Sequence, residues 1–423
     1  MTFFIDYKKL ALLTGLLLTG LLIGYLIYAL FFKAPAVPPA ETTPPPVSGS
    51  GQLPAAGTGT GAGIIKDIGS GQLPGSETGS AAETAGGQAP APSIDKTARG
   101  GVTETTRLNQ AESFAPVLSG NGADLQYYNK NDGKFYRITS DGEISALSSK
   151  KFFNVQKVTW AGNKQKAILE YPDGANILYD FQNKKQITLP KHWENFDFSP
   201  QSDKIVAKSM GTTPENRWLM IANDDGSQAR AIEPMGDNES SVYPAWSPNN
   251  LSIAIFTESA GFDRQKMYFI GQNNENFKSA TIEGRGLDFK WTPSGDRLIY
   301  SVYSDGTNLN PALWIVNAKG EDIGSNRQRL NLETWANKCA AAGEETLYCA
   351  VPKSLPEGAG LFPQLAKDAT DTIYQVNLKT GSKSLTAVPE GEYNVQNIII
   401  SEDERNLYFT DNATGNIHKI KLK

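Results

Sequence analysis

The chain has 423 residues, of which 40 are Lys or Arg and 45 are Asp or Glu, for a formal net charge of −5. This mild charge argues against nucleic-acid binding driven by bulk charge, which needs a basic patch, so no nucleic-acid partner is expected. The length allows one large domain of about 300 residues together with accessory segments.

An uncharged, apolar stretch lies close to the N-terminus. It covers residues 10–32 and exceeds the length of about 20 residues that spans a bilayer core. Lys8 and Lys9 precede it, so we predict a short cytoplasmic N-terminus at residues 1–9 followed by a single transmembrane helix. The rest of the chain would then lie outside the cytoplasm, in a periplasm or at the cell surface. A cleaved signal peptide is the alternative.

Two glycines of this stretch stand four residues apart. Gly20 and Gly24 have the GxxxG spacing that lets two membrane helices approach closely. The spacing leaves two interpretations open, a weak homodimer through these glycines and ordinary glycine use in a membrane helix.

Residues 33–101 are rich in Pro, Gly, Ser and Thr. The hexapeptide Gly-Ser-Gly-Gln-Leu-Pro occurs twice, at residues 49–54 and 69–74. A segment of this composition buries too little apolar surface to fold. We therefore predict a disordered linker that lets the following domain stand away from the membrane.

A repeat with a period of roughly 40 to 60 residues fills residues 102–423. Each copy has the pattern of a β-strand, a short polar turn and further strands. Aligned on the last residue of the first strand, the copies are marked by Leu118, Trp160, Phe198, Trp246, Trp291, Cys339 and Ile400. One copy cannot cover both of its own faces, so the copies must stack. The pattern predicts an all-β fold, a seven-bladed β-propeller, with six or eight blades as the alternatives.

Two copies carry a recognisable motif. Trp246-Ser-Pro-Asn-Asn and Trp291-Thr-Pro-Ser-Gly resemble the WD40-like repeat of TolB-type propellers, in which an aromatic residue and Ser-Pro-Asp-Gly precede a strand. The resemblance covers residues 114–423 and implies the fold rather than a function, because the repeat is structural. A predicted membrane anchor stands where TolB has an α/β domain, so the role of TolB in its envelope complex is not carried over.

The last copy lacks a fourth strand. After Ile400 it has strands predicted at residues 406–410 and 416–422. Residues 102–108 are β-prone and lie just before the first copy. We predict that they pair outside residues 416–422 and close the ring, which removes an edge that would favour aggregation.

Both cysteines fall in the sixth copy. Cys339 is expected to end the first strand of this copy and Cys349 to lie in the second. Adjacent antiparallel strands hold Cα atoms about 5.5 Å apart, within disulfide range, and exported domains retain disulfides. We predict a Cys339–Cys349 disulfide, with two buried thiols as the alternative.

The sequence offers little evidence of catalysis. The two histidines are His192 and His418, and no His, Cys and carboxylate group has zinc spacing, so neither a metal nor a cofactor is predicted. The Gly-x-Ser-x-Gly elbow of hydrolases does not occur in the sequence. Propeller glycosidases and lyases can use carboxylates and tyrosines around the channel. A carbohydrate-active enzyme of this kind is therefore the alternative function.

Binding is expected on one face of the propeller. In a four-stranded blade, the loops between the second and third strands share a face with the connections between blades. Here these loops lengthen, over residues 209–217, 258–265, 303–311 and 352–370. Loops on a rigid scaffold concentrate binding residues, and aromatic residues and Arg are frequent interface anchors. The candidate binding residues are Phe262, Arg264, Tyr303, Leu361 and Phe362.

These observations predict a non-catalytic scaffold or receptor that binds a protein or an envelope polymer through blades four to six. A competing interpretation has Leu361 and Phe362 folding back over their own blade as a lid. Two or three carboxylates converging with a Tyr at the channel mouth would favour the enzyme, and an aromatic rim would favour the binding protein.

Overall fold

The computed structural model describes residues 18–23, 25 and 93–423. Residues 18–23 and 25 are helical, and none of the described helical segments is long and apolar enough to cross a membrane. Most of the predicted transmembrane helix, including Gly24, and residues 33–92 of the predicted linker lie outside the described residues.

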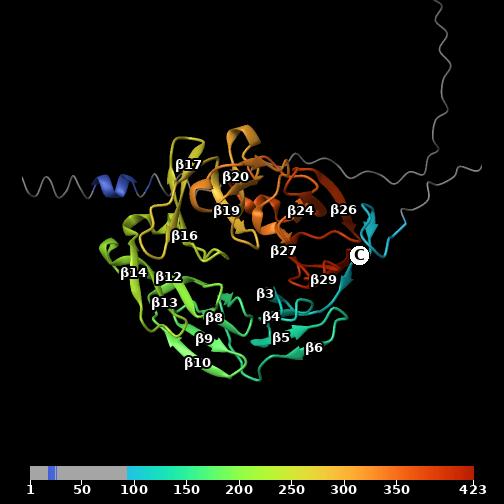
Figure 1. Ribbon diagram of the computed structural model, residues 1–423, viewed down its shortest axis with the longest axis horizontal. Helices are drawn as coiled ribbons and strands as arrows, with labels where there is room; N and C mark the ends of the chain where they lie inside the picture. Colours follow the sequence, from blue (N-terminus) through green and yellow to red (C-terminus); the bar gives the residue numbers. More distant parts are fainter. Residues whose placement is uncertain (1–17, 24, 26–92) are drawn as a thin grey trace, which may run out of the picture. The chain divides into compact units, whose positions relative to one another are not determined.

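Seven small sheets follow one another around a ring (Figure 1). In each sheet the strands of a blade pair in chain order, and the first strands of most neighbouring blades contact each other on the inner side of the ring. The predicted all-β, seven-bladed propeller is thereby confirmed, and six and eight blades are excluded. The strands of blades one to three are β3 Ser113–Leu118, β4 Leu125–Asn129, β5 Lys134–Ile138, β6 Ile144–Ala146, β7 Lys157–Trp160, β8 Lys166–Glu170, β9 Asn176–Asp180, β10 Lys185–Leu189, β11 Trp193–Phe198, β12 Lys204–Met210, β13 Arg217–Asn223 and β14 Arg230–Pro234.

Blades six and seven each receive one additional strand from the N-terminal side of the propeller, β1 Val102–Thr103 and β2 Thr106–Arg107 respectively. The other strands of blades four to seven are β15 Val242–Pro244, β16 Ser252–Ser259, β17 Arg264–Gly271, β18 Ala280–Glu283, β19 Arg285–Trp291, β20 Arg297–Tyr303, β21 Ala312–Asn317, β22 Gln328–Arg329, β23 Cys339–Ala342, β24 Thr346–Pro352, β25 Asp371–Asn377, β26 Lys383–Pro389, β27 Val395–Ile400, β28 Asn406–Asp411 and β29 Ile417–Lys421. Short 3-10 helices lie in the connections, at η1 Pro214–Asn216, η2 Gly236–Ser241, η3 Asp305–Thr307, η4 Gly320–Asp322, η5 Ala336–Lys338 and η6 Pro363–Ala366.

The apolar core lies between blades rather than at one centre. Residues 93–423 contain seven apolar clusters, one for each pair of neighbouring blades. Between blades four and five, for example, Met267 and Phe269 of β17 pack with Tyr300 of β20. Fully burying one large apolar side chain contributes about 1.5–3 kcal/mol, so each layer stabilises the two blades that it joins.

The repeated turn motif has a structural role. In four blades a Ser or Thr stands in the turn between the first and second strands, at Ser199, Ser247, Thr292 or Ser401, and its hydroxyl oxygen accepts a backbone N–H from the start of the second strand. The Ser247 hydroxyl, for instance, accepts the Leu251 and Ser252 N–H groups at 3.1 and 2.9 Å. These bonds satisfy donors that the turn would otherwise expose. These turns resemble one another in sequence because the fold needs a hydroxyl group at this position.

The alignment of the sixth copy was wrong. Cys339 is the first residue of β23, the first strand of this blade, and not its last residue as predicted. The strand ends at Ala342, and residues 343–345 form the turn to the second strand. In the fourth copy, β15 ends at Pro244, two residues before Trp246.

Residues 95–107 close the ring across two blades. β2 pairs antiparallel with β29, as predicted, through Thr106 opposite Lys419 and Arg107 opposite His418. The preceding β1, however, pairs parallel with β26 of blade six, which was not predicted. Before β1, the N–H of Ala98 donates to the carbonyl of Lys421 at 2.8 Å. The described end of the predicted linker therefore forms part of the hydrogen-bond network of the propeller.

Replacing residues 102–108 by Gly and Ser at unchanged length should lower the melting temperature (Tm) of the propeller by about 10 °C. The change removes the β1 and β2 pairings and the buried Thr103 and Leu108 side chains. A loss of 1 kcal/mol lowers Tm by about 2–4 °C in domains of about 150–250 residues, and several such contributions are lost. Differential scanning calorimetry measures the effect, with residues 50–56 replaced in the same way as the control. An unchanged Tm would contradict the closure.

Candidate functional site

The long loops of blades three to six lie on one face of the propeller, together with the connections between blades. The loop between β16 and β17 carries Phe262, which is 72% exposed, and Arg264 is the exposed first residue of β17. The loop between β24 and β25 carries Leu361 and Phe362, which are 40% and 50% exposed. Tyr303 ends β20 and is half-buried. All five predicted residues are therefore at least partly accessible on the predicted face.

A hollow of about 640 Å³ opens on this face over blades five to seven. We call it the amide hollow, because six Asn and Gln residues are among those that line it. Its walls come from the start of β19, the end of β20, η5, the loop between β24 and β25, the start of β27 and the residue after β28. The lining residues are Gly286, Leu287, Asp288, Tyr303, Trp335, Asn337, Lys338, Gly360, Leu361, Pro363, Gln364, Ala366, Lys367, Asn394, Gln396, Asn397 and Asn412. Of the predicted residues, Tyr303 and Leu361 line the hollow, whereas Phe262, Arg264 and Phe362 do not.

Two glycines fix the position of Tyr303. Gly286 has φ +65°, and a Cβ atom there would lie 2.4 Å from the Tyr303 ring. A Cβ atom on Gly360 would lie 2.7 Å from Tyr303 Cβ and 2.6 Å from the Leu309 carbonyl oxygen. Any larger residue at either position would displace the ring or the loop, so both glycines shape this side of the hollow.

Phe262 is connected to the hollow through Arg285. The Arg285 guanidinium lies 4.7 Å from the centre of the Phe262 ring, a cation–π distance. Arg285 in turn pairs with Tyr303 across β19 and β20. Phe262, Arg285, Tyr303 and Leu361 therefore form a continuous row over blades four to six, which we call the aromatic rim.

The loop that carries Leu361 and Phe362 leans on blade five. The N–H groups of Gly358 and Gly360 donate to the carbonyls of Asn308 and Leu309, at 3.0 and 2.8 Å. On its other side, Asn394 Nδ2 donates to the carbonyls of Ala366 and Lys367. The loop is thus held between blades five and seven by these bonds.

The charged groups at the base of the hollow are paired within the protein. Lys338 Nζ donates to both Asp371 carboxylate oxygens at 2.9 and 2.8 Å, and Asp371 Oδ2 accepts the Val395 N–H at 2.6 Å. Burial lowers the pKa of Lys338 and raises that of Asp371, and their mutual attraction opposes both shifts. Burial likewise raises the pKa of Asp288, whose Oδ2 accepts the Asn337 N–H at 2.8 Å.

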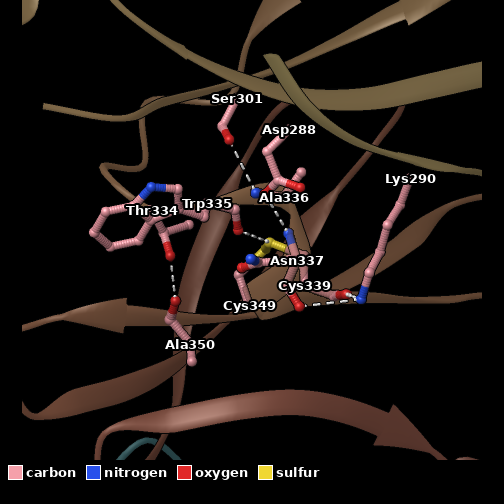
Figure 2. Close-up of a disulfide and its surroundings, with 10 residues drawn as sticks. All are labelled: Asp288, Lys290, Ser301, Thr334, Trp335, Ala336, Asn337, Cys339, Cys349 and Ala350. Carbon is pink, nitrogen blue, oxygen red and sulfur yellow. Dashed lines mark hydrogen bonds between the residues drawn. A yellow bond between two sulfur atoms is a disulfide. The ribbon is translucent and has the colours of Figure 1, made fainter. Parts of the chain in front are cut away.

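Residues 334–339 form the wall between blades five and six, and they are anchored at several points (Figure 2). Lys290 Nζ donates to the carbonyls of Asn337 and Cys339 at 3.1 and 2.8 Å. The Ala336 N–H donates to Ser301 Oγ at 3.1 Å. The predicted Cys339–Cys349 disulfide is confirmed, and it joins directly opposed residues of β23 and β24. Blade five and the disulfide together fix η5, which carries Asn337 and Lys338.

Several of these residues were not found from the sequence. Asp288 and Asn412 are 124 positions apart in the sequence, and the packing of blades five, six and seven against one another brings them together with Asn337 and Gln396. β27 has a β-bulge at Gln396-Asn397, with Asn397 at φ 49°, and the first strands of blades one, three and five have the same kind of bulge, with Ala115, Asn195 and Gly286 at positive φ. The bulge is therefore a feature of the repeat and does not by itself mark this hollow.

A second hollow, of about 390 Å³, lies on the same face over blades two and three. Its lining includes Glu170, Tyr171, His192 and Glu194. Glu170 Oε2 accepts the Asn195 N–H at 2.9 Å, and Oε1 is buried without a hydrogen bond in the described part of the chain, 3.5 Å from Lys157 Nζ. Residues 93–423 hold no group of three His, Cys, Asp or Glu side chains arranged to bind a metal ion.

Comparisons with known proteins support the fold alone. No family model matches the sequence, and no curated protein matches it, so the TolB-type resemblance stays a prediction. The Cps50 (Swd1) β-propeller domain of Myceliophteria thermophila is similar in structure, with 12% identity and TM-score 0.50 over 75% of this chain and 100% of that one. An oligogalacturonate lyase of Vibrio parahaemolyticus shares 11% identity with TM-score 0.48 over 75% and 93% of the two chains. A prolyl endopeptidase shares 13% identity with TM-score 0.48 over 74% and 50%. Because these proteins include enzymes and a non-enzymatic domain, they do not distinguish the two predicted functions.

Raising the pH should stabilise the wild-type protein relative to Lys290→Met. Burial lowers the pKa of Lys290 to about 8, although Asp288 favours its charged form, whereas an unfolded lysine titrates near 10.4. Between these values the unfolded chain binds more protons than the native one, so the stability contributed by this site rises with pH.

Urea unfolding at pH 7 and at pH 10 measures this effect. The free energy of unfolding of the wild type minus that of K290M should increase by about 1–2 kcal/mol. Lys151→Met, which replaces an exposed lysine, is the control and should show no such increase. A difference that stays constant between the two pH values would contradict the lowered pKa of Lys290.

Proposed function

We propose that this chain is a membrane-anchored, extracytoplasmic propeller that binds a protein or an envelope polymer without catalysing a reaction. The aromatic rim and the adjoining amide hollow form its recognition surface. The observation that carries the proposal is the continuity of the rim across three blades, from Phe262 through Arg285 and Tyr303 to Leu361. A contiguous surface of this kind on a rigid scaffold is suited to binding a large partner.

The exposed apolar side chains of this face support the same function. Phe262, Leu361, Phe362 and Leu365 are each at least 40% exposed and belong to two loops of the same face. Aromatic side chains beside Arg are frequent energetic anchors in interfaces. None of these side chains fills an inter-blade cluster, so folding alone does not account for them.

The disulfide supports the extracytoplasmic placement. Disulfides persist in oxidising compartments and are rare in the cytosol. The Cys339–Cys349 bridge is fully buried next to η5, and there it braces the wall of the amide hollow. Together with the predicted transmembrane helix at residues 10–32, it favours a domain displayed outside the cytoplasm.

The triple variant Phe262→Ala, Arg264→Ala and Phe362→Ala should lose partner capture. Its Tm should stay within a few degrees of the wild type, because all three side chains are exposed. The measurement is a crosslinked pull-down from membranes that contain the full chain, with Tm measured in parallel.

The matched control is Ile144→Ala with Leu251→Ala. Both residues are exposed apolar side chains next to turns of the opposite face, so this variant should capture the partner normally. Capture that survives the triple variant would remove the loops that carry Phe262 and Phe362 from the recognition surface.

A carbohydrate-active enzyme is the second candidate function, and the hollow over blades two and three favours it. Glu170 and Glu194 line this hollow together with Tyr171, which is the combination of groups that propeller glycosidases and lyases can use. Against it, Glu170 is already engaged by the Asn195 N–H and by Lys157.

Incubation of the full chain with polysaccharides, followed by mass spectrometry of the soluble products, separates the two functions. A non-catalytic protein releases no oligosaccharides. Release that is lost in the double variant Glu170→Gln and Glu194→Gln would establish the enzyme instead.

A further inference from the structure

The amide hollow offers unused hydrogen-bonding groups from four separate segments. The side chains of Asn337, Gln364, Gln396 and Asn412 line it and make no hydrogen bond to any part of the chain that the structure describes. Each amide offers two N–H donors and a carbonyl acceptor with two lone pairs. One opening therefore presents both donors and acceptors to a ligand.

Most charges of the hollow are balanced within the protein. Lys338 is paired with Asp371, and Asp288 accepts the Asn337 N–H and is attracted by the charge of Lys290. The remaining lining charge, Lys367, is highly exposed at the outer edge and lies 4.0 Å from Asp368. Since a buried charge on a ligand needs an opposite charge in its site, this arrangement disfavours both an anionic and a cationic ligand.

Aromatic side chains complete the walls. The Tyr303 ring lies against Gly286 on one side, and Trp335 lies beside η5 on another. A sugar ring presents an apolar face of C–H groups together with hydroxyls that both donate and accept, which matches aromatic walls surrounded by amides. β19 and β27, which line the hollow, are each the innermost strand and therefore one edge of their sheet, so a peptide bound by strand addition is the competing ligand that the tetraalanine probe tests.

We propose that the amide hollow binds a neutral carbohydrate chain, held by amide hydrogen bonds from blades five to seven and by contact with Tyr303 and Trp335. This inference rests on the proposed function, and it assigns the chemistry of the polymer. The opening on the loop face lets a chain pass in and out, so the hollow binds an internal segment of a long polymer as well as a short oligosaccharide.

Isothermal titration calorimetry of the full chain in detergent tests the assignment. The probes are the neutral tetrasaccharides of β-1,4-glucose, α-1,4-glucose, β-1,4-mannose and β-1,4-N-acetylglucosamine, with tetragalacturonate and tetraalanine for comparison. At least one neutral probe should bind, and the variant Gln396→Ala with Asn412→Ala should weaken its Kd at least tenfold, because two pairs of amide hydrogen bonds are lost.

The control variant is Gln182→Ala with Gln201→Ala, which removes two exposed amides from the opposite face and should leave the Kd unchanged. Both variants should keep the Tm of the wild type, since neither removes a hydrogen bond within the described part of the protein. Binding of tetragalacturonate or tetraalanine that depends on Gln396 and Asn412 would overturn the neutral assignment.

The same measurement distinguishes this inference from the proposed function. Absence of binding for all four neutral probes, with membrane capture still lost in the Phe262, Arg264 and Phe362 triple variant, would overturn the carbohydrate assignment and leave the binding function in place. Membrane capture that is retained both in the triple variant and in the Gln396→Ala, Asn412→Ala variant would overturn the proposed function and the carbohydrate assignment that rests on it.

Discussion

The structure depends on the apolar layers between neighbouring blades. A single four-stranded blade has two faces and cannot cover either of them, so each blade is stable only when it packs against the next. The clusters that join the blades are similar in composition, and the ring closes because residues 95–107 cross from blade six to blade seven. Closure leaves the inner strands of all blades facing one axis, and it brings side chains from distant parts of the sequence to the same face.

Blades five to seven are also joined by a series of polar contacts. Asp288 and Lys290 of blade five hold the backbone of residues 337–339, and Lys338 then pairs with Asp371 of blade six. Asp371 accepts the Val395 N–H of blade seven. Removing one partner of a buried ion pair costs about 3–5 kcal/mol, so this series is sensitive to substitution. The amide hollow lies directly above it, and its shape therefore follows from contacts that also stabilise the ring.

The repeat architecture could be predicted because the blades share one strand–turn–strand pattern. In four blades a Ser or Thr hydroxyl binds the backbone of the turn before the second strand, and the aromatic residues near it enter the inter-blade layers. In the sixth blade the predicted strand end at Cys339 was wrong, although the predicted disulfide is confirmed, because Cys339 and Cys349 are opposed whichever residue ends the strand. The predicted loop residues are accessible, but the amides of the hollow could not be predicted. Asn337, Gln396 and Asn412 are single polar residues in three separate blade segments, and no local pattern connects them.

Hydrogen–deuterium exchange of the full chain, free and crosslinked to its captured membrane partner, tests the recognition surface most directly. The account predicts slower exchange in the bound form for peptides that cover residues 260–265, 284–288, 334–338, 358–367 and 394–397, which lie on the loop face of blades four to seven. Protection confined to blades one to three, or to the turns of the opposite face, would contradict it.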